Sequence, residues 1–204
     1  MDSVFLATAF ATLFVVIDPI GLTPLFVALT QGMEARARRA IGFRACLVAF
    51  GILALFGLFG EAVLGFVGIR MPAFRIAGGV LLFLTALDML FERRTKRRED
   101  SAEERSDPSI FPLGMPLIAG PGAIATMILL VGESGGGWQG ILTVHAVMIF
   151  VVLLAFLLFL IAGPLERALG RTGTVVITRL LGMLLAALSV QFVIDGIRGT
   201  GLIG

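Results

Sequence analysis

The apolar run Val4–Leu29 constrains the fold more than any other stretch, because its middle holds residues that a plain membrane helix rarely carries. These are Asp18, Pro19, Gly21 and Pro24. A carboxylate at the centre of a bilayer costs about 2.5–3.5 kcal/mol, so an acid there indicates a function. Each proline removes a backbone donor and breaks the preceding turn. A broken helix is tolerated at membrane depth only where protein or water surrounds it, and the rest of the chain must supply that environment.

Five further apolar runs predict an all-α integral membrane protein with six transmembrane helices. The 204 residues are 58% hydrophobic and only 15% charged, which a soluble domain is not. At about 20 residues per span, the length suits six helices. The five runs cover residues 41–67, 73–91, 110–131, 140–162 and 175–197. The first residues lack the basic start of a cleavable signal peptide, so we expect the first span to be retained.

Basic residues gather on one side of the predicted membrane. Thirteen of the 16 Lys and Arg residues lie in or beside the first, third and fifth connections. By the positive-inside rule these connections face the cytoplasm, and both termini lie outside it. Residues 92–107 hold six basic and six acidic residues and predict a charged cytoplasmic linker. Residues 164–174 predict a polar connection. Loop charge also accounts for the net charge of +2, and no nucleic-acid partner is expected.

Three short motifs recur in the same order in the second half of the chain. Asp18-Pro19 is matched by Gly120-Pro121, 102 residues later. The other matched pairs are 75–85 with 179–189, at an offset of 104, and 61–65 with 166–170, at an offset of 105. These matches predict one membrane domain, 1–204, made of repeat one (1–91) and repeat two (108–204). Because each repeat holds three spans, an odd number, the two repeats are expected to be inverted.

Corresponding interruptions in inverted repeats indicate a binding site near the membrane midplane. Pro19 and Pro121 each suit a first helical position, so each restarts a helix with free N–H groups toward the midplane. We expect the amides at Gly120–Gly122 to bind a carboxylate, and Asp18 to bind an ammonium group or a coupling cation. The predicted substrate- or ion-binding residues are Asp18, Pro19, Gly21, Thr23, Pro24, Gly120, Pro121, Gly122, Thr126 and Gln191.

The same residues also suit a structural role. Asp18 would then be a buried helix cap at a Pro/Gly kink, and the threonine hydroxyls would serve helix packing. Asp88 and Asp195 lie near span ends, where contact with water is the default. His145 has no partners at metal-ligand spacing, and no phosphate loop or catalytic triad occurs. We therefore predict no metal site, no enzyme activity and no cofactor other than a coupling H⁺ or Na⁺.

Segments 18–24, 75–82, 116–124 and 191–197 resemble the MarC family of bacterial inner-membrane proteins. The resemblance spans essentially the whole chain. It implies an inner (plasma) membrane location and a relationship to small neutral amino-acid transporters and, more distantly, to LysE-type exporters. The leading hypothesis is a secondary transporter of a small neutral amino acid or similar small zwitterion. Its expected partners are that small-molecule substrate, the lipid bilayer and, as a homo-oligomer, further copies of the chain. The alternatives are a non-transporting membrane packing or assembly protein and a multidrug efflux pump.

Overall fold

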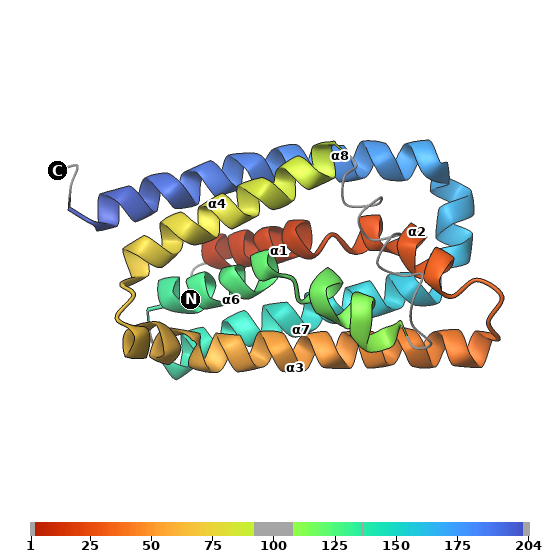
Figure 1. Ribbon diagram of the computed structural model, residues 1–204, viewed down its shortest axis with the longest axis horizontal. Helices are drawn as coiled ribbons and strands as arrows, with labels where there is room; N and C mark the ends of the chain where they lie inside the picture. The colour runs from red at the N-terminus through yellow and green to blue at the C-terminus, as the bar shows by residue number, and fades with distance from the viewer. Residues whose placement is uncertain (1–2, 92–107, 136, 202–204) are drawn as a thin grey trace.

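The computed structural model describes residues 3–91, 108–135 and 137–201. Within these residues every regular element is helical, which confirms the predicted all-α class. The predicted charged linker, 92–107, lies outside the described residues. The elements are α1 (Ser3–Ile17), α2 (Pro19–Leu29), α3 (Ala35–Val67), α4 (Met71–Leu90), η1 (Ser109–Ile118), α6 (Pro121–Glu133), α7 (Trp138–Leu160) and α8 (Ala162–Gly199), as Figure 1 shows.

Five segments in the described part of the chain are long and apolar enough to cross a membrane. They are Ser3–Leu29, Ala35–Val67, Met71–Leu90, Trp138–Leu160 and Thr172–Gly199. The pair formed by η1 and α6 makes a sixth if its two helices, which meet at a bend of 52°, count as one span. The chain is therefore a multi-pass integral membrane protein with five or six spans, where the sequence predicts six.

The helix boundaries follow from local chemistry. Gly68 ends α3 with a φ of +82°, a conformation that costs glycine little, and so permits a short connection to α4. The predicted polar connection over 164–174 contains the first, short part of α8, which breaks at Gly170, and the last apolar span begins at Thr172. Pro164 falls in the first turn of α8, where no backbone donor is needed. The helix then changes direction at Gly170, which has a φ of +62°.

The helices pack mainly between the two halves of the chain. In the first half, α1 and α2 pack against α7 and α8. In the second half, η1 packs against α3, and α6 packs against α3 and α4. The halves also meet where α3 lies on α7 and where α4 lies along α8 (Figure 1). Among the described residues of the first half, no two helices make extensive contact with each other. The two halves are thus interleaved.

Glycines permit the close approach of α4 and α8. A β-carbon at Gly79 would lie 2.8 Å from the backbone oxygen of Ser189 and 2.7 Å from Val193 Cγ2. A β-carbon at Gly182 would lie 3.0 Å from Met89 Cβ. Residue numbers along the contact rise on α4 as they fall on α8, from Gly79 with Val193 to Met89 with Gly182, so the two helices run antiparallel. Small residues at such a seam let backbones pack closely, which is how membrane helices associate.

Candidate functional site

The first break is a capped restart of the helix at Asp18. Its backbone has φ 53° and ψ 61°, a left-handed conformation that Asp and Asn tolerate better than most residues. Asp18 Oδ1 accepts a hydrogen bond of 3.0 Å from the backbone N–H of Gly21, so the side chain caps α2. Pro19 follows at the first helical position. The Asp18 side chain is only 1% exposed.

Neighbouring residues close around this cap. A β-carbon at Gly21 would collide with the Asp18 carboxylate and lie 2.8 Å from Thr178 Oγ1 of α8, so glycine leaves the space that the cap needs. The Thr23 hydroxyl donates to the backbone oxygen of Pro19 at 3.0 Å. Pro24 lies half-buried inside α2. These contacts give the first break the structural role that the sequence left open, and ligand binding at Asp18 stays a prediction.

The second break lies between η1 and α6. Gly120 is extended, with φ −80° and ψ 170°, and α6 starts at Pro121. The first backbone bond of α6 runs from Ile124 N to Gly120 O at 3.0 Å, so the N–H groups of the first turn have no helical acceptor. A β-carbon at Gly120 would lie 2.6 Å from the backbone oxygen of Pro116, so this position has a steric need for glycine.

The segment that precedes the second break, η1, has an irregular backbone. Phe111 and Met115 are extended within it, and each precedes a cis proline, Pro112 and Pro116 respectively. Backbone hydrogen bonds to the carbonyl five residues earlier hold the segment. One of them runs from Ala119 N–H to Gly114 O at 3.0 Å. The bends leave the end of η1 apart from α4.

A cavity of about 310 Å³ opens beside the second break. Its walls come from α4, η1 and the start of α6, with Val16 added from α1. The polar lining consists of Thr85 and Asp88 on α4 and the break residues Gly120–Gly122. Asp88 is the one ionisable side chain among the lining residues. The cavity lies toward the end of the molecule at which α4 ends and η1 begins.

The structure does not bring the two breaks together in this cavity. Asp18 is buried and does not line it, and Val16 is the residue of the first span that does. The acid beside the second break is Asp88, for which contact with water at a span end is predicted. The acid and the helix start expected at a binding site therefore share a cavity between α4 and α6, and the two breaks do not share one.

The remaining predicted residues lie elsewhere. Thr126 is fully buried, and its Oγ1 has no hydrogen-bond partner in the described part of the chain. Gln191 is exposed on α8 and donates from Nε2 to Asp195 Oδ1 at 2.9 Å, away from the cavity lining. The ring nitrogens of His145 face the backbone oxygens of Ile141, at 2.7 Å, and Ala54, at 3.4 Å, contacts that suit a structural role.

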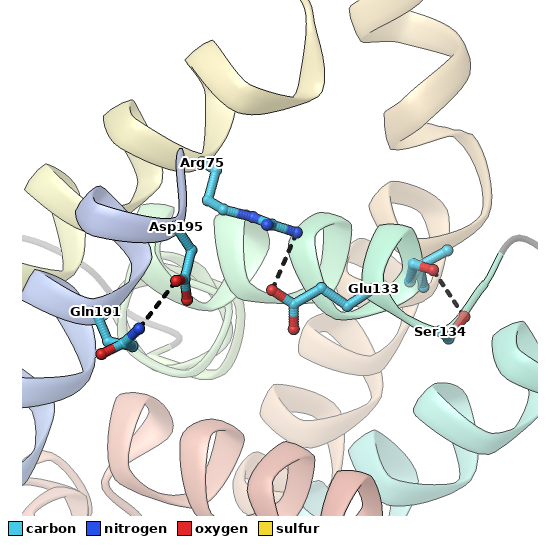
Figure 2. Close-up of polar contacts among 6 residues, drawn as sticks. Arg75, Glu133, Ser134, Gln191 and Asp195 are labelled. Carbon is cyan, nitrogen blue, oxygen red and sulfur yellow. Dashed lines mark hydrogen bonds and ion pairs between the residues drawn. The ribbon is translucent and has the colours of Figure 1, made fainter. Parts of the chain in front are cut away.

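A second polar group, the Arg75 cluster, joins three helices at the other end of the molecule (Figure 2). Arg75 Nη2 of α4 lies 3.1 Å from Glu133 Oε1 of α6. Asp195 and Gln191 of α8 lie beside this ion pair, and Arg198 Nη1 is 3.9 Å from Asp195 Oδ1. Nothing in the sequence marks Glu133 as a partner of Arg75, because an acid at a span end usually contacts water.

The helical segments define a polytopic α-helical membrane protein. Residues 3–200 match the model of the family described as MarC family integral membrane protein. The chain belongs to the MarC family.

Curated relatives agree with this assignment. The chain is 34% identical to the UPF0056 membrane protein MJ1677 of Methanocaldococcus jannaschii, over 98% of each chain. It is 38% identical to the UPF0056 membrane protein YvbG of Bacillus subtilis, over 96% of this chain and 95% of the relative. It is 33% identical to YhcE of Escherichia coli, over 93% and 90% respectively. No solved structure matches the chain significantly.

Proposed function

We propose that the protein is a secondary transporter of a small neutral amino acid, or a similar small zwitterion, across the plasma membrane. The observation that carries this proposal is the cavity, where Asp88 and residues Gly120–Gly122 at the start of α6 line one space. A helix N-terminus favours a carboxylate through its unpaired N–H groups and its dipole. A carboxylate such as Asp88 favours an ammonium group. One small zwitterion satisfies both, and a coupling H⁺ or Na⁺ would drive its movement.

The contacts between the halves support an origin in two inverted repeats. At the sequence offset of 104, Met89 corresponds to Val193, and Gly78 corresponds to Gly182. Gly79 approaches Val193, and Gly182 approaches Met89, so the contact is reciprocal to within one residue. A two-fold relation between the repeats predicts such reciprocity. The antiparallel course of α4 and α8 suits a two-fold axis in the membrane plane, as inverted repeats require.

The cavity and its repeat-related counterpart differ, as alternating access requires. Cavity residues Leu81 and Thr85 correspond to Leu185 and Ser189 in the second repeat. Leu185 and Ser189 are fully buried, and Asp18 is 1% exposed. We take the open cavity and this buried counterpart as the two states that transport by inverted repeats would exchange.

The direction of opening follows from the proposed orientation. Helix α1 begins and α8 ends at the same end of the molecule, on the left of Figure 1. That arrangement suits the prediction that both termini lie outside the cytoplasm. The cavity lies toward the opposite end, next to the two helices that flank residues 92–107. The described conformation would therefore receive its substrate from the cytoplasm.

A non-transporting packing or assembly protein would have both breaks packed shut. The first break fits that description, whereas the second opens onto the cavity. Multidrug efflux suits the cavity less well, because about 310 Å³ lies at the bottom of the range for drug-sized ligands, about 300–1,000 Å³.

Transport by purified protein in proteoliposomes tests the proposal. We expect radiolabelled alanine or glycine to accumulate under an H⁺ or Na⁺ gradient. Asp88→Asn removes the charge but keeps the shape, and losing a charge-assisted hydrogen bond of about 1.5–3 kcal/mol weakens apparent affinity about 10- to 150-fold. Glu34→Gln is the matched control, because Glu34 is exposed before α3 and its side chain makes no cap bond.

Two results would contradict the proposal. One is an absence of gradient-driven accumulation of any neutral amino acid. The other is an Asp88→Asn protein that binds and transports like the wild type. An α-hydroxy acid, which keeps the carboxylate and lacks the ammonium group, provides a further check. Its affinity should not respond to Asp88→Asn.

A further inference from the structure

The seam between α1 and α6 holds two buried hydroxyl groups at one level. Val16 Cγ1 of α1 lies 3.5 Å from the position of a β-carbon on Gly122 of α6. The two helices run antiparallel (Figure 1). Thr12 precedes Val16 by one turn, and Thr126 follows Gly122 by one turn. Both threonines therefore lie one turn from the same contact, in the same direction away from the cavity.

Among the described residues, most other threonine hydroxyls bond within their own helix, although Thr178 Oγ1 is also buried without a partner. Five threonines donate to the carbonyl four residues earlier: Thr23, Thr30, Thr85, Thr143 and Thr174. Thr12 and Thr126 are each 0% exposed, and neither Oγ1 has a hydrogen-bond partner within the described residues. A buried polar group without a partner costs about 1–3 kcal/mol. Two such groups at one level indicate a polar guest, either substrate or water, in another conformation.

The Arg75 cluster lies farther along the same seam. Gly122, Thr126 and Glu133 are spaced by four and seven residues, so they share one face of α6. Arg75 and Glu133 join α4 to α6 at the end opposite the cavity. Between the two threonines and the ion pair the seam is apolar. There Gly78 of α4 meets Leu129 of α6, whose Cδ1 would lie 3.0 Å from a β-carbon on Gly78.

We infer that a closed passage continues from the cavity along the α1–α4–α6 seam past Thr12 and Thr126, and that the Arg75–Glu133 ion pair closes its far end. This inference rests on the proposed transport function. The passage would carry the same small zwitterion, with the threonine hydroxyls donating to its carboxylate after it leaves the amides of α6. Arg75 comes from the first half of the chain and Glu133 from the second, so separating the halves at this end requires their ion pair to break.

Cysteine accessibility tests the passage in intact cells without any substrate. Thr126→Cys or Thr12→Cys is placed in a Cys46→Ser background, and a membrane-impermeant maleimide is added outside. With the ion pair intact we expect slow labelling. Glu133→Gln, or Arg75→Gln, should raise the labelling rate about tenfold, the equivalent of about 1.4 kcal/mol in the opening equilibrium. The double charge swap Arg75→Glu with Glu133→Arg should return the rate toward that of the unaltered pair.

Thr23→Cys is the control, because Thr23 is equally buried but lies on α2 and is hydrogen-bonded. Equal increases at Thr23→Cys and Thr126→Cys would indicate general loosening and overturn the inference. Two further results would also overturn the inference. One is a labelling rate of Thr126→Cys that neither Glu133→Gln nor Arg75→Gln changes, and the other is a charge swap that does not lower the raised rate. Transport without any labelling response would refute the passage alone, whereas a labelling response without transport would refute the proposed function alone.

Discussion

Substitutions at Asp18 separate its role as a helix cap from a role in ligand binding. Asp18→Ala loses the cap bond to Gly21 N, which contributes about 0.5–2 kcal/mol. It also places an ordinary side chain at a φ of 53°, at a cost of about 1–2 kcal/mol. We therefore expect Asp18→Ala to lose about 1.5–4 kcal/mol of stability. Asp18→Asn keeps a cap acceptor and tolerates the left-handed conformation, so its loss should stay below about 1 kcal/mol. Asp18→Gly relieves the backbone and loses the cap, so it should fall between them.

Cys46 supplies the assay. It is the single cysteine of the chain and is 7% exposed, so a thiol-reactive fluorogenic dye reports unfolding in detergent. At about 2–4 °C per kcal/mol for a chain of this size, Asp18→Ala should lower the Tm by roughly 3–16 °C. Unchanged stability of Asp18→Ala would refute the capping role. If Asp18→Asn is as stable as the wild type yet abolishes transport, the negative charge has a function beyond the cap, as the sequence predicts.

Two glycine substitutions test close backbone contacts by the same dye assay. Gly120→Ala would press a β-carbon against the Pro116 backbone oxygen at 2.6 Å, and we expect a loss of about 1–3 kcal/mol. Gly79→Ala would do the same at 2.8 Å from the Ser189 oxygen in the α4–α8 seam, with a similar loss. Gly65→Ala is the control for both, because nothing lies within 4 Å of its β-carbon position, and it should gain up to about 1 kcal/mol of helix propensity. Equal Tm values for all three variants would contradict the steric argument.

Local chemistry in the sequence predicts where the helices run and where two of them break. Apolar runs of about 20 residues give the spans, and Pro19 and Pro121 restart helices because neither position needs a backbone donor. The length of α8 is less predictable. Residues 164–174 are polar enough to suggest a connection, and they do join two spans, but the sequence does not indicate that they are helical on either side of a break at Gly170.

The sequence does not reveal which residues of different helices become neighbours in the fold. Asp88 and Glu133 are both acids near span ends, and composition gives each the same expectation of contact with water. Both acids keep some exposure, as expected, but antiparallel packing also places Asp88 in the same cavity lining as the start of α6 and Glu133 against Arg75. Thr12 carries no signal at all, because a lone threonine in an apolar run normally bonds to its own helix.

The interleaving of the two halves has a consequence for biosynthesis. While only residues 3–91 have entered the membrane, α1 and α2 lack the surfaces of α7 and α8 against which they pack. The buried carboxylate of Asp18 then borders lipid or water instead of α8, where Thr178 later lies. The helices of the first half are therefore expected to stay only loosely associated with one another until the last helix is inserted. A chain that stalls or is truncated before α8 should be recognised by membrane quality control as unassembled, even though most of its spans are already in the bilayer.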